Sequence, residues 1–317
     1  MFTASNHRTG VILMTYGSAT TWENVPAYFE SIYKGKASAE TIADFVERYR
    51  VVGGSPLVRI TNEQAALLEQ NLGESFVVRA GMRHSAPSID SAIAECRAAG
   101  ATQLVGIILS PQFSSFIMEG YRTSFTASAQ MQGFAEGSYA IAKPWHTEKN
   151  FVILLVQRIK KSLSELRAIY DVEIPIVFTT HSLPQRVVEK DPQYLTQISA
   201  TFEAVRSQLD PALRTYEGYQ SAGHTPEEWL KPDLTHILTE VAREKSPAVL
   251  IVPIQFLADH LEILYDLDVA GREQCAERGI AYHRIELPNT DPLFIESLAA
   301  TTRACLGSLS SKKAPLF

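Results

Sequence analysis

Cysteine is scarce in this sequence, and long apolar runs are absent. The 317 residues contain three cysteines (Cys96, Cys275 and Cys305) and no CxxC pair, which excludes a disulfide framework and a four-cysteine metal or iron–sulfur site. No stretch reaches the roughly 18 apolar residues that a membrane-spanning helix needs. The first ten residues lack a basic segment followed by an apolar one, so we expect a protein of the cytoplasm.

An excess of positive charge is also missing. Lysine and arginine total 29 against 35 acidic residues, a net charge of −6, which argues against binding to nucleic acid or to an anionic membrane. Hydrophobic residues make up 45% of the chain and charged residues 20%, so a buried core can form. The length is about twice that of a typical domain and predicts two lobes.

The common nucleotide and hydrolase motifs are absent as well. The chain has no GxGxxG, GxxxxGK[ST], HExxH or GxSxG in a usable context. The Gly53–Pro56 stretch is typical of a turn that starts a helix rather than of a phosphate loop.

The sequence does contain apolar runs that alternate with amphipathic segments. Continuous apolar strands between helices predict parallel sheets covered on both faces, an α/β fold. The expected strands are 11–16, 76–80, 104–109, 139–142, 175–179, 214–219, 248–254 and 282–286. The expected helices between them include 86–99, 151–166, 234–244 and 294–306.

The two halves of the chain resemble each other. IILSPQFSSF (107–116) parallels LIVPIQFLADH (250–260), and the strand–proline–helix segments at 141–155 and 284–298 repeat at nearly the same offset. We therefore predict two similar Rossmann-like lobes with a substrate cleft between them. The first lobe would span residues 1–165 and the second 166–317, with the C-terminal helix free to pack across both.

The first half carries an insertion in its first crossover. From Tyr16 to Gly81 there are 65 residues, but from His181 to Gly218 only 37. The extra residues lie at about 22–56, are rich in aromatic and basic side chains, and begin at the carboxyl end of a strand, where α/β sheets bind ligands. This pattern predicts a lid, and a surface pair of helices is the alternative.

His181 and the segment that follows residue 257 are candidates for chemistry. His181 follows the strand IPIVFTT, and Ser182 after it can cap a helix. In ADHLEILYDLD (258–268), Glu262 and Asp266 share one helix face. Either feature alone fits a structural role. Together, one imidazole and one carboxylate suit a borderline divalent metal that passes through rather than resides, since a resident site needs more protein ligands. Tyr16, after the first strand, is a further candidate.

Several motifs together resemble the ferrochelatase family, and the resemblance covers nearly the whole chain. They are MTYGSAT (14–20), GGSPL (53–57), GMRHSAP (81–87), SPQFSSF (110–116), FTTHSLP (178–184), YQSAGHTPEEWLKPD (219–233), VPIQFLADHLEILYDLD (252–268) and LPNTDPLFIESLA (287–299). The resemblance implies a lyase of haem biosynthesis that inserts ferrous iron, as a substrate, into a porphyrin.

Carried over by position, the resemblance implies roles for individual residues. His181 and Glu262 would be the catalytic and metal-binding pair, with Asp266 and His84 as supporting or relay residues. The tyrosine at position 16 resembles the coproporphyrin III enzymes of Gram-positive-type bacteria and would be an axial ligand to iron in the product. The substrate-binding set would be Tyr16, Tyr33, Arg48, Tyr49, Ser55 and Tyr121. Family members often have arginine where this chain has Tyr33, and an acid where it has Ala270.

The resemblance implies no resident cofactor and no iron–sulfur cluster, and we expect a monomer that binds porphyrin but neither nucleic acid nor membrane. Transient contact with downstream haem-pathway enzymes is left open. So are three alternatives: a protoporphyrin IX ferrochelatase, a cobalt or nickel chelatase of a reduced tetrapyrrole, and a non-catalytic porphyrin or haem carrier. Whether His181 or Glu262 accepts the pyrrole protons is not determined by the sequence.

Overall fold

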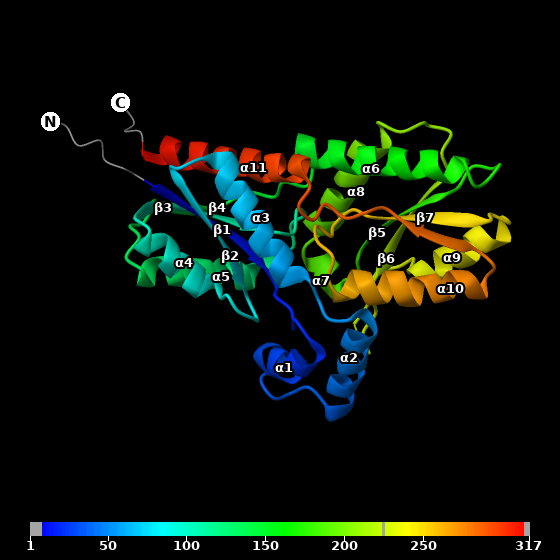
Figure 1. Ribbon diagram of the computed structural model, residues 1–317, viewed down its shortest axis with the longest axis horizontal. Coiled ribbons are helices and arrows are strands. Elements are labelled where there is room, and N and C mark those ends of the chain that lie inside the picture. The colour runs from blue at the N-terminus through cyan, green and yellow to red at the C-terminus, as the bar shows by residue number, and fades with distance from the viewer. Residues whose placement is uncertain (1–7, 224–225, 314–317) are drawn as a thin grey trace. The chain divides into compact units, whose positions relative to one another are not determined.

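The chain forms two compact units (Figure 1). The computed structural model describes residues 8–223 and 226–313. Unit 1 comprises residues up to 111, 115–145 and from 289 onward, and unit 2 comprises residues 112–114 and 146–288. Each unit contains a four-stranded parallel sheet with helices on both faces.

Unit 1 has the strand order β2-β1-β3-β4. Its strands are β1 (Arg8–Thr15), β2 (Phe76–Met82), β3 (Ala101–Ile108) and β4 (Tyr139–Ile141). Its helices are η1 (Trp22–Asn24), α1 (Val25–Tyr33), α2 (Ala39–Val52), α3 (Leu57–Leu72), α4 (Ile89–Ala98), α5 (Ser115–Met131) and α11 (Pro292–Lys313). The pair α3 and α11 packs together on one face of the sheet, and the pair α4 and α5 packs on the other.

Unit 2 has the strand order β6-β5-β7-β8. Its strands are β5 (Ile176–His181), β6 (Thr215–Gln220), β7 (Ala248–Pro253) and β8 (Ala281–Arg284). Its helices are α6 (Lys149–Arg167), α7 (Gln185–Lys190), α8 (Gln193–Arg206), α9 (Leu234–Arg243), the π-helix η2 (Glu262–Gly271) and α10 (Arg272–Glu277). The two orders are identical once β5 is matched to β1, so the predicted duplication and α/β fold are confirmed.

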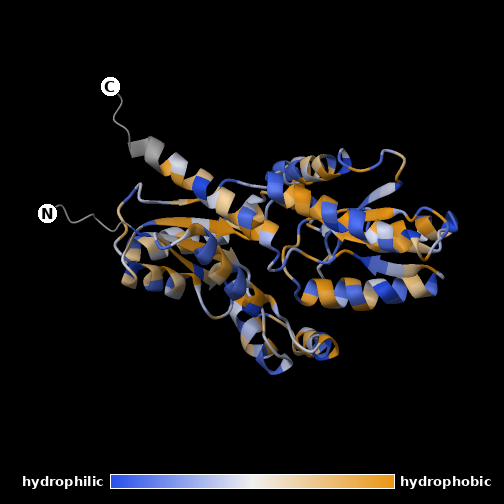
Figure 2. Cartoon of the chain, turned by 45° about the horizontal axis from the view of Figure 1, so that its top comes forward, coloured by the Kyte–Doolittle hydropathy of each residue, from blue (hydrophilic) through white to orange (hydrophobic). Residues whose placement is uncertain are grey.

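The apolar runs become strands because both faces of each sheet are covered. Residues 11–14 of β1 have no solvent-exposed surface, and all six residues of β7 are buried. Figure 2 shows that most strands are hydrophobic throughout, whereas the helices carry both hydrophilic and hydrophobic residues. This is the burial that a parallel sheet between helical layers requires. It also explains why strand positions could be read from the sequence.

The boundary between the units differs from the predicted division near residue 165. Helix α6 packs on β7 and α8, so it belongs to unit 2, and the chain passes between units near residue 145. Helix α11 packs on α3 and β3, which returns the C-terminal segment to unit 1. Residues 112–114 join unit 2, where Gln112 donates a hydrogen bond to Thr201 over 3.0 Å. Apolar periodicity identifies a helix but not the sheet on which it packs.

The segment at 22–56 folds into η1, α1 and α2. Ser38 caps α2, with its hydroxyl accepting from the backbone N–H of Thr41, and Gly53 ends the helix in the left-handed conformation at φ 75°. The matching crossover of unit 2 holds only α7 and α8. None of the helices in the described ranges is long and apolar enough to cross a membrane.

Candidate functional site

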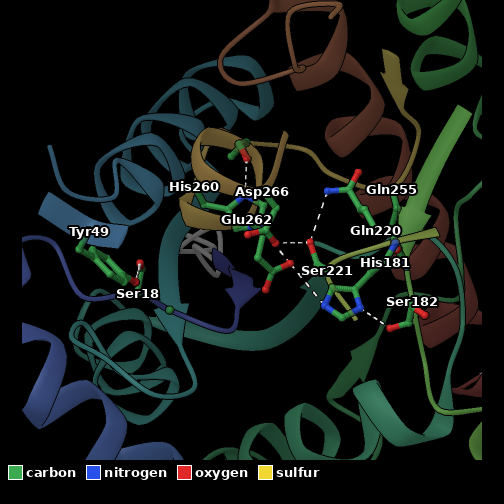
Figure 3. A network of polar contacts seen from close by, with 12 residues as sticks. Ser18, Tyr49, His181, Ser182, Gln220, Ser221, Gln255, His260, Glu262 and Asp266 are labelled. Carbon is green, nitrogen blue, oxygen red and sulfur yellow. Dashed lines mark hydrogen bonds and ion pairs between the residues drawn. The ribbon is translucent and has the colours of Figure 1, made fainter. Parts of the chain in front are cut away.

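His181 and Glu262 lie side by side in unit 2 (Figure 3). His181 is the last residue of β5, and Glu262 opens η2 after the neighbouring strand β7. Their closest atoms, Nε2 of His181 and Oε2 of Glu262, are 3.5 Å apart, and the side chains are 29% and 39% exposed. The pair predicted from strand ends therefore forms at one edge of a parallel sheet and is open to solvent.

Buried polar residues hold His181 from behind. Its backbone N–H donates to Oε1 of Gln255 over 2.9 Å, and the Tyr194 hydroxyl donates to the His181 carbonyl over 2.7 Å. The imidazole Nδ1 contacts the carbonyl oxygen of Ser182. A carbonyl can only accept, so Nδ1 carries a proton, and in the neutral ring Nε2 presents its lone pair toward Glu262.

The sequence suggested that Ser182 caps a helix, but in the structure it does not. Helix α7 begins at Gln185 without a side-chain cap, and the Ser182 hydroxyl donates to the carbonyl of Leu230 over 3.4 Å. Pro184 limits how the chain can continue here, since it cannot donate a backbone hydrogen bond. The serine therefore ties the strand end to a neighbouring loop.

His260 is a third member of this cluster. Its Nδ1 faces the carbonyl of Ala258 at 2.9 Å, and its Nε2 lies 3.7 Å from Oε2 of Glu262. Burial lowers the pKa of His260, but the hydrogen bond and charge of Glu262 outweigh burial and raise that pKa overall. Burial raises the pKa of Glu262, but the two histidines outweigh it and lower that pKa to about 2. Glu262 is therefore an anion at neutral pH.

Asp266 continues the acidic face of η2 beyond Glu262. Its Oδ2 accepts a hydrogen bond from the Ser221 hydroxyl over 2.5 Å, and Ser221 adopts a left-handed backbone with φ 57° directly after β6. A left-handed serine is uncommon and is tolerated where surrounding contacts fix it. The helix on which the sequence places Glu262 and Asp266 is thus a π-helix, with a serine beside the second acid.

The other acids of this segment belong to an ion-pair network. Arg284 donates to Oδ2 of Asp268 over 2.7 Å, and its Nη2 lies 3.5 Å from Oδ1 of Asp259. The Tyr282 hydroxyl also donates to Asp268 over 3.0 Å. Asp259 therefore pairs with an arginine. Within the described residues, no group of three or more His, Cys, Asp or Glu side chains is arranged to hold a metal ion.

Tyr16 and His84 form a second cluster, in unit 1. Tyr16 follows β1 and is 39% exposed, and its ring centroid lies 4.5 Å from that of His84. The His84 backbone N–H donates to the Tyr16 carbonyl over 3.0 Å. Burial, and then the charges of Arg83 and Lys34, lower the pKa of His84. The ring contact and the backbone hydrogen bond together hold His84 beside the tyrosine.

Of the predicted binding residues in the insertion, Tyr33 is exposed and Arg48 is partly buried. Tyr33 ends α1 and is 44% exposed, with its ring 5.3 Å from that of Phe29. Arg48 of α2 pairs with Asp44 over 2.8 Å and lies over the Phe45 ring at 4.9 Å. A hydrophobic aromatic base with a polar rim suits a flat, apolar ligand that bears charge at its edge.

The remaining predicted binding residues are buried. Tyr49 is 2% exposed, and its hydroxyl hydrogen-bonds to that of Ser18 over 2.7 Å (Figure 3). Ser55 and Tyr121 are 6% and 4% exposed, and burial raises the pKa of Tyr121. In this structure Tyr49 joins α2 to the loop after β1, a role that its sequence position alone does not reveal.

Sequence reasoning missed His260, Ser221, Gln255 and Tyr194 as parts of the site. Gln255 stood out only as half of the internal repeat with Gln112. Tyr194 and Ser221 lie far along the chain from His181 and Glu262, and without the sheet order β6-β5-β7-β8 nothing brings them together. His260 has a local signal, since it lies two residues before Glu262.

Comparisons with known proteins identify relatives along nearly the whole chain. The ferrochelatase family model matches residues 8–305. The chain is 33% identical over 299 residues to a coproporphyrin III ferrochelatase of Geobacillus sp. (strain WCH70), covering 92% of this chain and 95% of that protein. It is 32% identical over 312 residues to the coproporphyrin III ferrochelatase of Bacillus subtilis (strain 168), covering 96% and 99%.

A solved structure shares the fold. SirB from Bacillus subtilis with Fe3+ superposes with a TM-score of 0.60 at 12% identity, covering 96% of this chain and 98% of that one. At that identity the likeness concerns only the chelatase-like architecture of two α/β units. The family match over nearly the whole chain carries the assignment: this protein is a member of the ferrochelatase family.

Proposed function

We propose that this protein inserts ferrous iron, as a substrate, into coproporphyrin III to give the iron porphyrin of haem biosynthesis, as a lyase of the metal-chelatase type. The observation that carries the proposal is the solvent-open pair of His181 Nε2 and Glu262 Oε2, 3.5 Å apart. One imidazole nitrogen and one carboxylate oxygen form an incomplete ligand set, which suits a metal that must leave for the macrocycle.

The reaction replaces two pyrrole protons with one dication, so the site must attract a cation and accept protons. Glu262 is suited to the first task because its pKa of about 2 keeps it ionised. Because Glu262 takes the first task, we assign proton acceptance to Nε2 of His181. The imidazole takes up one pyrrole proton, passes it to water through its exposed side, and then accepts the second.

The first unit supplies groups suited to holding the porphyrin. Tyr16 is the proposed axial oxygen ligand to iron in the product, and Tyr33 and Arg48 offer an exposed ring and a cation. Binding contacts remote from the reacting nitrogens can distort a flat macrocycle, at a cost of about 1–5 kcal/mol. Such distortion would expose the pyrrole lone pairs to the metal. Tyr49, Ser55 and Tyr121 would support this surface from beneath it.

The substrate choice rests on Tyr16 and on the names of the two relatives. The test is anaerobic incubation of the protein with ferrous iron and either coproporphyrin III or protoporphyrin IX, followed by the Soret band. Faster insertion into coproporphyrin III is expected. Equal or faster insertion into protoporphyrin IX would overturn the substrate assignment. Binding of both porphyrins without insertion would indicate a carrier instead.

The same assay tests the residues. His181→Ala and Glu262→Gln should each lower kcat about 100-fold or more, because each removes a group that acts in the chemical step. The exposed His236–Glu240 pair on α9, 3.4 Å apart, offers a matched control. His236→Ala and Glu240→Gln should leave kcat unchanged. Near wild-type turnover in either site variant would refute the assignment of that residue.

A further inference from the structure

Arg83 stands beside Tyr16 at the carboxyl edge of the first sheet. It directly follows β2, and its backbone N–H donates to the carbonyl of Thr15 over 3.0 Å. The guanidinium carbon lies 6.0 Å from the centre of the Tyr16 ring and 5.8 Å from that of Tyr121. The side chain is exposed, so one side of the guanidinium remains accessible to a ligand.

A glycine on the neighbouring helix makes room for this guanidinium. A Cβ atom at Gly120 of α5 would lie 2.0 Å from Cζ of Arg83 and 2.2 Å from its Nη2. Any side chain at position 120 would therefore push the guanidinium away. A glycine within a helix costs about 1 kcal/mol of stability relative to alanine. Helix α5 therefore bears this cost at the turn that adjoins Arg83.

Among the described residues, no carboxylate pairs with the guanidinium of Arg83. Other arginines of unit 1 pair with carboxylates, including Arg48 with Asp44 at 2.8 Å and Arg79 with Glu69 at 3.0 Å. Over the described residues, the Arg83 guanidinium has neither a hydrogen bond nor an ion pair. The charges of Arg83 and Lys34 both act on His84, so the surroundings of Tyr16 are positive.

We propose that Arg83 binds a carboxylate of the tetrapyrrole substrate, and that Gly120 keeps its guanidinium in the position to do so. The inference rests on the proposed function, which brings a polyanionic macrocycle to Tyr16. A guanidinium presents two parallel N–H groups that match a carboxylate, and the tyrosine rings limit its orientation. Arg83 thus selects for substrates with a carboxylate on the part of the rim that extends past Tyr16.

The test measures binding of metal-free coproporphyrin III by fluorescence. Arg83→Gln and Gly120→Ala should each weaken binding about five- to tenfold, the worth of one exposed charge-assisted contact. The double variant should be no weaker than either single one, because both changes remove the same contact. In turnover, KM should rise while kcat stays near wild type. With the methyl ester of the porphyrin, the variants and wild type should bind alike.

Arg97 provides the control. It is another arginine of unit 1 that lies over an aromatic ring, 5.1 Å from the centre of Phe134, but it contacts the carbonyl of Ala101 at the opposite edge of the sheet. Arg97→Gln should leave binding unchanged. If wild type binds porphyrin and Arg83→Gln binds equally well, or if the two single effects add, the proposal for Arg83 is refuted. If wild type binds no porphyrin, the proposed function itself fails. Gly120→Ala should not lower the thermal midpoint, which separates displacement of Arg83 from misfolding.

Discussion

At the scale of single residues, the chemistry of the site depends on which ring nitrogen of each histidine faces Glu262. The carbonyl oxygen of Ser182 accepts a hydrogen bond from Nδ1 of His181, so Nε2 is the ring nitrogen that faces Glu262. His260 contributes a second imidazole to the same carboxylate from the buried side. Removal of either histidine would therefore raise the pKa of Glu262 as well as remove an imidazole from the site.

Tyr16→Phe separates binding of the product from insertion of the metal. The change removes the phenolic oxygen that we assign as an axial ligand and keeps the ring against His84, 4.5 Å between centroids. Insertion should continue, because the proposed proton acceptor and metal ligand are His181 and Glu262. The absorption spectrum of the iron coproporphyrin complex should shift, as expected when an axial oxygen is lost. An unchanged product spectrum would remove Tyr16 as the ligand.

Residues were predictable from the sequence where chemistry and position coincide, and not elsewhere. His181 and Glu262 each follow a strand, and parallel strands bring such ends together, so their meeting follows from the fold. The sequence does not reveal that Tyr49 is buried against Ser18, since an aromatic residue in an insertion fits either a binding surface or an internal contact. Arg83 was hidden because its space depends on a glycine of another helix.

At the scale of elements, strands were predicted better than the helix that carries the acids. Apolar runs such as residues 248–254 agree with β7 to within a residue, because burial on both faces leaves an unbroken pattern. The segment after Glu262 was expected to be an ordinary helix but is the π-helix η2 over ten residues. Apolar residues three and four apart do not reveal whether backbone bonds span four residues or five. π-Helical turns are rare and concentrate at functional sites.

The cap of α2 tests whether the insertion contributes to porphyrin binding. Ser38→Ala removes the hydroxyl that accepts from Thr41, and it should cost about 1 kcal/mol of stability and loosen the helix that bears Arg48. Its KM for porphyrin should rise.

The comparison variant for this test is Glu148→Ala. It removes the carboxylate that accepts from Phe151 at the start of α6, in the other unit. The variant should lose a similar amount of stability, because it also loses a helix cap, while its KM for porphyrin stays at the wild-type value. Equal effects of both variants on KM would argue that α2 is an ordinary surface helix.

At the scale of the whole molecule, the two similar sheets carry different groups at their carboxyl edges. Both have the same strand order, yet their carboxyl edges differ in charge. Tyr16 in unit 1 has Arg83 and Lys34 nearby, whereas His181 in unit 2 faces Glu262, with Asp266 further along the same helix. The net charge of −6 conceals this contrast. The basic edge suits the carboxylates of a porphyrin, and the acidic edge suits a divalent cation.

Folding stability should depend on pH through partly buried histidines, and His283 offers the clearest test. It lies on β8, where its Nε2 is 3.2 Å from the Tyr170 hydroxyl, and burial followed by the charge of Arg272 lowers its pKa from the ordinary 6.5. Because the folded pKa is below the unfolded one, the unfolded chain binds the proton first. The contribution of His283 to stability is therefore full above pH 6.5 and falls as the pH drops toward the folded pKa.

His84 and His146, whose pKa values are also lowered, act in the same direction, and His260, whose pKa is raised, acts in the opposite one. In thermal unfolding between about pH 8 and pH 5, His283→Asn should lose less stability on acidification than wild type, since its side chain takes up no proton in that range. Parallel curves for the two proteins would show that His283 titrates alike in the folded and unfolded chains, contrary to the burial seen at β8.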